Sequence, residues 1–211
     1  MSDVVSRPFT TTDRLLSAGL IGGPVAFISA WALFGARTPG YSPIHDHISD
    51  LAAVDAPTRV LMNLGFTAFA VSIAAATVPA GKFLGTPTAV AFGANVAVSV
   101  AIMLAPLGRS PEGDRAHAVV AGLGYLILAA TAPSAARSLW TRSRGLGVAS
   151  VAVGAVSLAC LGMSLVRPES GFWQRAGITA TDAWLIAMGV SGVTRGHVGE
   201  PGNTADTAND V

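Results

Sequence analysis

The sequence predicts an all-α fold, a polytopic membrane helix bundle with six transmembrane helices and a short interfacial helix in its first outer loop. Three observations support this prediction. Hydrophobic residues make up 51% of the 211-residue chain, and the mean hydropathy is +0.56. Charged residues make up 12%, roughly half the usual share in a soluble domain, so they could not cover a soluble core of this size. The apolar residues also fall into six runs of roughly 20, the length that crosses a bilayer.

Polar segments divide the chain into three parts. Residues 1–13 form a polar N-terminal tail, residues 14–194 the six-helix transmembrane domain, and residues 195–211 a glycine-rich C-terminal tail that we expect to be disordered. The spans are expected at residues 14–36, 58–79, 87–107, 116–137, 145–166 and 178–194.

The first span and the polar segment after it each carry a local structural signal. Gly19 and Gly23 lie on one face of the first span, where their lack of a side chain lets a second helix approach closely. Ser42 is a good N-cap and Pro43 suits the first helical position. A short interfacial helix is therefore expected over residues 43–53.

The second and third spans each contain an asparagine. The segment 55–57, Asp-Ala-Pro, repeats the helix-start signal and opens the second span, with Asn63 one turn inside it. A short loop at residues 80–86 leads to the third span, in which Asn95 lies well inside the bilayer. Amide side chains at such depths are expected to form hydrogen bonds between helices.

The connections that lead into the last three spans alternate in charge. Those before the fourth and sixth spans contain acids, and the one before the fifth contains none. Asp114 and His117 lie one turn apart at the start of the fourth span. A loop at residues 137–144 that contains no acid leads to the fifth span, and a polar loop at residues 167–177 leads to the sixth. Asp182 is expected near the start of the sixth span.

Acidic residues and histidines are concentrated on one predicted side of the membrane. An even number of spans puts both termini on one side and the first, third and fifth loops on the other. The side that carries the termini has no acid between Asp13 and Glu200. Its short basic loops predict that both termini are cytoplasmic, in a multi-pass protein of the plasma membrane. The polar residues gathered on the acidic side are His45, Asp46, His47, Asp50, Asp55, Glu112, Asp114, His117, Glu169, Gln174, Arg175 and Asp182.

Three interpretations of this acidic side stay open. In the first, it holds zinc with one position left for water, although no standard zinc-binding spacing occurs and no cofactor is predicted. In the second, a histidine paired with an aspartate acts as general acid or base on a lipid headgroup, with Asp50, His117 and Asp114 as candidate catalytic residues. In the third, these groups cap helix starts and pair with Arg59, Arg115 or Arg175. The possible zinc ligands are His45, His47, Asp50, Asp114 and His117.

The remaining polar side chains suggest ligands and exclude some classes of partner. The net charge of +1 gives no indication of nucleic-acid binding. Cys160, the single cysteine, excludes an internal disulfide and a cysteine-based zinc site. Membrane lipids are the expected partners, and the oligomeric state is left open. The candidate ligand-binding residues are Ser49, His47, Asn63, Gln174, Arg175 and Asp182.

Several motifs resemble the prokaryotic membrane family called domain of unknown function 998. They include the Ile48-Ser-Asp-Leu51 core, which also has a weaker similarity to the DRAM, Frag and Sfk group of six-helix proteins. The resemblance covers about residues 14–194 and implies a six-helix inner-membrane protein without an assigned activity. Within the first of the matching segments, His45 and His47 are peripheral to the family pattern, which weakens the zinc interpretation. The matching segments are residues 39–52, 56–57, 62–66 and 171–177, with Asp114, His117 and Trp184.

The sequence therefore predicts a lipid-interacting or structural membrane component with a polar, Asp- and His-lined pocket at its extracytoplasmic end. The first alternative is an integral-membrane hydrolase or transferase that acts on a lipid or its headgroup. The second is a small transporter, which is less favoured because no charge is expected at mid-membrane and no span is visibly broken.

Overall fold

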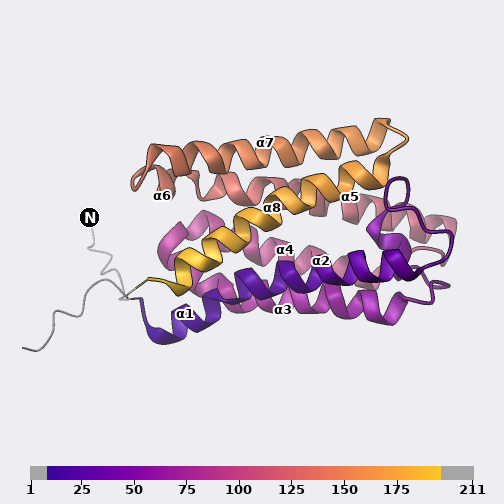
Figure 1. The fold of residues 1–211 in the computed structure, drawn as a ribbon, viewed down its shortest axis with the longest axis horizontal. Helices are drawn as coiled ribbons and strands as arrows, with labels where there is room; N and C mark the ends of the chain where they lie inside the picture. The colour runs from indigo at the N-terminus through magenta and orange to yellow at the C-terminus, as the bar shows by residue number, and fades with distance from the viewer. Residues whose placement is uncertain (1–8, 196–211) are drawn as a thin grey trace, which may run out of the picture.

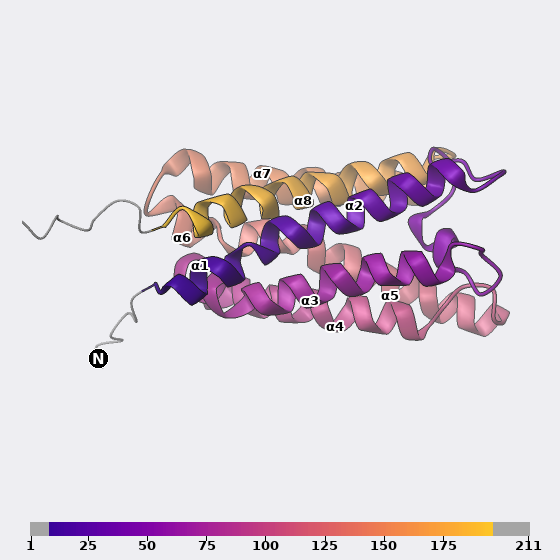
Figure 2. The same cartoon turned by 60° about the horizontal axis from the view of Figure 1, so that its bottom comes forward.

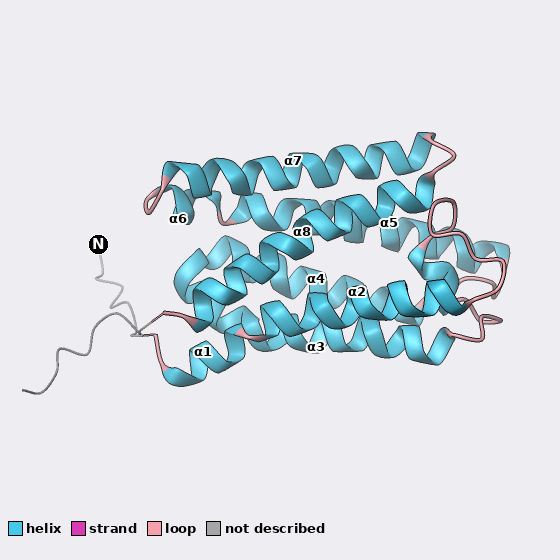
Figure 3. Cartoon of the chain, in the orientation of Figure 1, coloured by secondary structure: helices cyan, strands magenta, loops and turns pink. Residues whose placement is uncertain are grey.

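A computed structural model describes residues 9–195 and confirms the all-α class. Within these residues the chain forms helices and connecting loops, with no strand (Figure 3). Six segments of the described residues are long and apolar enough to cross a membrane, so the chain is a multi-pass membrane protein. These segments are Thr11–Arg37, Arg59–Leu84, Thr86–Leu104, Pro111–Trp140, Arg144–Val166 and Ser170–Val193.

The six spans form a closed ring of helices. Each span packs against the next along the chain, and the last packs against the first (Figures 1 and 2). Half of the last span is buried, against 28–39% of each of the others, so it is the innermost helix of the bundle. The helices are α1 (Thr11–Ser17), α2 (Gly19–Arg37), α3 (Arg59–Leu84), α4 (Thr86–Leu104), α5 (Pro111–Ser134), α6 (Ala136–Trp140), α7 (Arg144–Val166) and α8 (Ser170–Val193), with the short 3₁₀ helix η1 (Ile48–Ala52) before α3.

The three acid-bearing loops meet at one end of the bundle, as the alternation of spans predicts (Figure 1). This acidic end consists of the connections 38–58, 105–110 and 167–169. The Val54 N–H donates to the Leu107 carbonyl at 2.9 Å, and the Phe172 N–H donates to the Ile44 carbonyl at 2.9 Å. The first loop is thereby joined both to the α4–α5 connection and to α8. Residues 9 and 195, the two ends of the described segment, both lie against Phe83 at the opposite end, which we call the terminal end.

The predicted interfacial helix over residues 43–53 is wrong in extent. The Asp46 carboxylate accepts a bond from the Ser42 N–H at 2.7 Å and closes a turn there. His47 is extended, with φ −77° and ψ 158°, and serves as the N-cap of η1. Aspartate side chains compete in this way with helical backbone bonds. The helix therefore begins only at Ile48.

At the terminal end, helical structure begins inside the predicted N-terminal tail. Thr10 and Asp13 form a capping box, so α1 begins at Thr11. Asp13 is buried and forms an ion pair with Lys82 at 2.7 Å. The predicted disordered tail covers residue 195, which the structure describes, and residues 196–211, which lie outside the described residues.

Candidate functional site

The first loop closes the acidic end by wrapping around Arg175 of α8. The Arg175 side chain is 7% exposed. Its Nη1 donates at 2.8–2.9 Å to three carbonyl oxygens, those of Pro43, Asp46 and Gly171. A buried cation needs such compensation, and here backbone carbonyls rather than carboxylates provide it.

Aromatic rings and Gln174 complete this closure. Arg175 Nη2 donates to the Tyr41 hydroxyl, and the guanidinium lies 5.3 Å from the centroid of the Trp31 ring. Gln174 Oε1 accepts from the Ile48 N–H at 2.8 Å, and its Nε2 donates to the Tyr125 hydroxyl. Two predicted ligand-binding residues, Gln174 and Arg175, thus hold the first loop against the helices.

The acidic side chains at this end mainly cap their own loops. The carboxylates of Asp50 and Asp114, two candidate catalytic residues, each accept a bond from a nearby backbone N–H, that of His47 at 2.7 Å and that of Gly108 at 2.8 Å. Such bonds are the expected N-cap and turn contacts of aspartate. The capping part of the structural interpretation therefore agrees with the geometry.

The pairing part of that interpretation is wrong. Within residues 9–195 there are two ion pairs, Lys82 with Asp13 and Arg167 with Glu169. None joins an acid to Arg59, Arg115 or Arg175. For Arg175, backbone carbonyl oxygens supply the compensation instead.

The candidate zinc ligands do not form a cluster. Across the described part of the chain, no group of three or more histidine, cysteine, aspartate and glutamate side chains could hold a metal ion. His45 Nδ1 lies 3.0 Å from the Pro168 carbonyl oxygen, on the α7–α8 side. His117 Nδ1 lies 2.6 Å from the Ala105 carbonyl oxygen, on the α4–α5 side.

His117 faces a small cavity under the first loop. Because a carbonyl only accepts, Nδ1 carries the proton in the contact with Ala105, and Nε2 is left with a free lone pair. His117 is 5% exposed, and Nε2 has no hydrogen-bond partner among the described residues. The cavity has a volume of about 10 Å³, near the minimum for one water molecule. Ser49 and Asn63 also line it, so three of the predicted site residues meet here.

The most unusual polar group lies deeper, in the middle of α8. Asp182 is twelve residues after Ser170 and eleven before Val193, so it lies roughly 18 Å along the helix from its start. Its side chain is fully buried, and neither carboxyl oxygen has a hydrogen-bond partner within residues 9–195. The prediction that Asp182 belongs to the acidic end is therefore wrong.

Asp182 lines the central cavity of the bundle, which has a volume of about 70 Å³. The walls come from α2, α3, α4, α5 and α8 and are mostly apolar. Asn95, Ser99 and Tyr125 are the other polar side chains in them. The phenylalanines in the wall are Phe27, Phe66 and Phe69.

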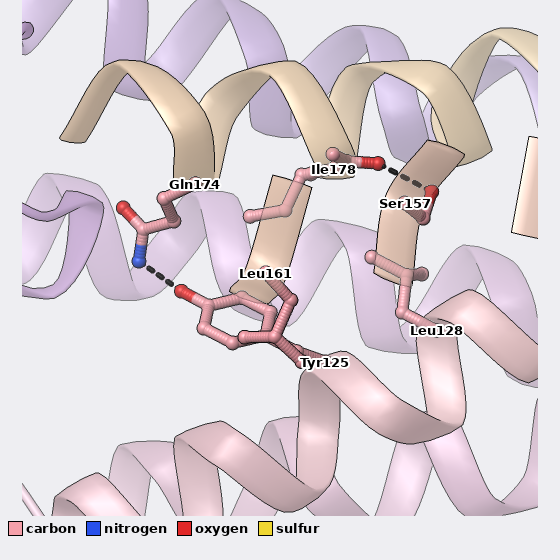
Figure 4. A pocket seen from close by; sticks show the side chains of 7 residues that line it. Tyr125, Leu128, Ser157, Leu161, Gln174 and Ile178 are labelled. Carbon is pink, nitrogen blue, oxygen red and sulfur yellow. Dashed lines mark hydrogen bonds between the residues drawn. The ribbon is translucent and has the colours of Figure 1, made fainter. Parts of the chain in front are cut away.

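Two smaller cavities adjoin the central one. The cavity at His117 shares Phe66 and Ile102 with it. A third cavity, of about 10 Å³, shares Tyr125, Leu128 and Ile178 with it and extends to Gln174 and Ser157 (Figure 4). The central cavity is thus bordered by small cavities that reach towards the acidic end.

The depth of Asp182 could not be predicted because the start of α8 was misplaced. Residues 170–177 contain Gln174 and Arg175 and are too polar to be assigned to a membrane span, yet they form the first two turns of α8. This extension moves Asp182 from the helix start to its middle. The sequence argued against a transporter because no charge was expected at mid-membrane. That expectation was wrong, since Asp182 lies in the middle of α8.

The comparisons with known proteins agree with the fold and supply no activity. A family model described as "Protein of unknown function (DUF998)" matches residues 20–191. No curated protein and no solved structure matches the chain.

Proposed function

The chain belongs to the DUF998 family, whose description assigns no function, and from the geometry of its own bundle we propose that it binds a small amphipathic amine in the central cavity. The observation that carries this proposal is the carboxyl of Asp182 on the cavity wall, which is fully buried and has no hydrogen-bond partner among the residues that the structure describes. An ionisable group inside a membrane bundle is costly, and such groups commonly belong to binding or transport sites.

The other polar groups of the cavity favour a ligand that donates hydrogen bonds. Asn95 Nδ2 donates both its hydrogens, to the Ala91 carbonyl at 2.9 Å and to the Thr131 hydroxyl at 2.8 Å, so only the amide oxygen is left. Ser99 donates its hydroxyl hydrogen to the Asn95 carbonyl at 2.8 Å and keeps its lone pairs. With Asp182, the wall offers mainly acceptors, which match an ammonium group.

The apolar walls fit the rest of an amphipathic amine. The Phe27 ring lies 5.1 Å from the Phe66 ring and 5.7 Å from the Phe69 ring, measured between centroids. Aromatic faces attract cations and pack against alkyl chains. One water needs roughly 10–15 Å³, so the cavity accommodates on the order of five water-sized groups. A short alkylamine that partitions into lipid is therefore a suitable probe, and the proposal is a specific form of the lipid-interacting role.

The enzyme alternative has less support from the geometry. A hydrolase needs a nucleophile within hydrogen-bond reach of a base. Ser49 and His117 line the same cavity, but among residues 9–195 His117 Nε2 has no hydrogen-bond partner. Asp50 and Asp114 are engaged in capping bonds.

The test measures binding of n-butylamine, n-butanol and butyrate to the purified protein in detergent by titration calorimetry. We expect the amine to bind at least tenfold more tightly than the alcohol, and butyrate not to bind. Asp182→Asn should weaken amine binding at least tenfold, because it removes the anion and keeps the shape of the side chain. Asp55→Asn, an exposed acid at the acidic end, is the matched control and should bind as the wild type does.

Thermal unfolding of each variant provides the control for folding. Asp182→Asn should melt no lower than the wild type, because the carboxyl that it removes makes no hydrogen bond to any described residue. Equal affinity for amine and alcohol, or unchanged amine binding in Asp182→Asn, would contradict the proposal.

A further inference from the structure

We propose that His117 relays protons between the acidic end and Asp182 through the two adjoining cavities, so that the central site alternates between a proton and a cation. The inference rests on the proposed function for the meaning of that exchange, but the proton path itself is independent of any amine. It starts from two buried titratable side chains that line cavities, His117 and Asp182, of which Nε2 and both carboxyl oxygens have no hydrogen-bond partner in the described part of the chain.

The first step concerns the position of the two groups. His117 lies in the second turn of α5, close to the acidic end, and Asp182 lies in the middle of α8. Their cavities share two wall residues, Phe66 of α3 and Ile102 of α4. The relay requires these two side chains to rotate so that water can pass between the cavities. Side chains in packed interiors do change rotamer.

The second step is the chemistry of the relay. The Ala105 carbonyl holds the proton on Nδ1, so Nε2 is the atom that gains and loses the mobile proton. A hydronium ion that enters from the acidic end gives its proton to Nε2, which forms the imidazolium and leaves a neutral water molecule. Nε2 then returns to its neutral form by giving a proton to water in the central cavity, and the hydronium ion formed there protonates the Asp182 carboxylate and becomes water again. One O–H bond of the incoming hydronium ion breaks, one N–H bond forms and breaks, and one O–H bond forms at Asp182.

The third step is the absence of competing charges along this route. Among the residues that line the two cavities, the titratable ones are His117, Tyr125 and Asp182. The nearest cation along α8, Arg175, is held by backbone carbonyls of the first loop. Asp114, one turn before His117, accepts from the Gly108 N–H. Neither the lining nor these neighbours supplies a fixed partner that would keep Asp182 ionised.

The consequence for the central site is a coupling between proton and amine. An ionised Asp182 attracts an ammonium group, whereas a neutral Asp182 does not. Protons that arrive through His117 therefore displace the amine, and the amine displaces the proton. By linkage, the affinity for the amine should fall as the pH at the acidic end falls.

The test follows the protonation of Asp182 without any amine. A laser flash releases protons from a caged acid, and time-resolved infrared spectroscopy records the carbonyl band of a protonated carboxyl in the reconstituted wild-type protein. The band that disappears in Asp182→Asn is assigned to Asp182. We expect His117→Gln, whose amide can keep the bond to Ala105, to slow the rise of this band at least tenfold without changing its final height.

A second pair of variants tests the passage between the cavities. Ile102→Phe enlarges a shared wall residue and should slow the rise of the band as well. Val100→Phe, on the exposed side of the same helix, is the control and should leave the rate unchanged. A wild-type rate in His117→Gln or in Ile102→Phe would overturn the relay, and so would the absence of any band that depends on Asp182. An intact relay with no amine binding would contradict the proposed function alone.

Discussion

Arg175 illustrates how a single side chain organises the acidic end without an acidic partner. Its guanidinium is surrounded by the carbonyl oxygens of Pro43 and Asp46 and by the rings of Trp31 and Tyr41. Each of these groups belongs to α2 or to the first loop, whereas Arg175 belongs to α8. The arginine therefore joins the first and last spans, and removing it would leave several carbonyls unpaired.

Tyr41 makes this closure sensitive to alkaline pH. Burial raises the pKa of the Tyr41 hydroxyl from 10.0 to about 12, although the nearby Arg175 charge acts in the opposite direction. Since the pKa is higher in the folded state, the neutral hydroxyl stabilises the fold below pH 10, and this contribution is lost as the pH rises towards 12. Neutral Tyr41 also donates to the His47 carbonyl at 2.9 Å.

We therefore expect wild type to melt at a higher temperature than Tyr41→Phe at pH 7, by an amount that corresponds to about 1 kcal/mol for the lost hydrogen bond. The difference should shrink between pH 10 and pH 12. Thermal unfolding, monitored by circular dichroism, gives the melting temperature of both proteins. Tyr125 is present in each, so its own titration cancels in the comparison. A difference that stays constant up to pH 12 would contradict the assigned role of Tyr41.

At the same scale, the sequence predicts some roles and not others. The capping bond of Asp50 follows from residue type and local spacing, since His47 and Asp50 are three apart. The free lone pair of His117 depends on the Ala105 carbonyl, twelve residues away. Such a contact is set by how α4 and α5 pack, which local sequence does not specify.

At the scale of elements, apolar runs located the spans well but misplaced their ends. Where a loop was predicted over residues 80–86, only Gly85 separates α3 from α4. Its φ of 97° ends the helical conformation between the two helices. Pro79, expected to end a span, lies inside α3. Helices in a bundle extend past the apolar core where neighbours satisfy their polar residues, as Lys82 does through its ion pair with Asp13.

The contact between α5 and α7 depends on a glycine that the sequence does not distinguish from its neighbours. A Cβ at Gly154 would collide with the Pro133 ring and the Ala129 carbonyl of α5, whereas a Cβ at Gly162 would meet nothing within 4 Å. Both glycines lie in α7. Comparing alanine substitutions at these two glycines therefore separates the effect of close packing from the effect of helix propensity.

We expect Gly154→Ala to destabilise the protein by about 1–3 kcal/mol through overpacking. Gly162→Ala should be neutral or stabilising by up to about 1 kcal/mol, because alanine favours helix more than glycine. Cys160 is the single cysteine and is buried, so its reaction with a thiol-reactive dye during heating reports unfolding. Equal melting temperatures for the two variants would contradict the close α5–α7 contact.

For the whole molecule, the ring of spans explains why polar chemistry is found in two layers. The acidic end uses its charges to hold loops in place, and the central cavity contains one carboxyl, that of Asp182, that has no hydrogen-bond partner within residues 9–195. The first layer was predictable, because the alternation of spans places three polar loops together. The second was not, because a cavity is a property of how five helices meet.

The orientation of the bundle in the membrane is the remaining prediction at this scale. Both termini are expected to be cytoplasmic, because the connections at the terminal end carry basic residues without acids.

Single cysteines in a Cys160→Ser background report this arrangement at the exposed positions Asp55, Glu112 and Arg144. In intact cells, a membrane-impermeant maleimide should label Asp55→Cys and Glu112→Cys, and it should label Arg144→Cys only after permeabilisation. The reverse pattern would invert the orientation and keep the fold. Labelling of Asp55→Cys and Glu112→Cys from opposite sides would contradict the acidic end itself, because the Val54–Leu107 hydrogen bond requires those two loops to lie together.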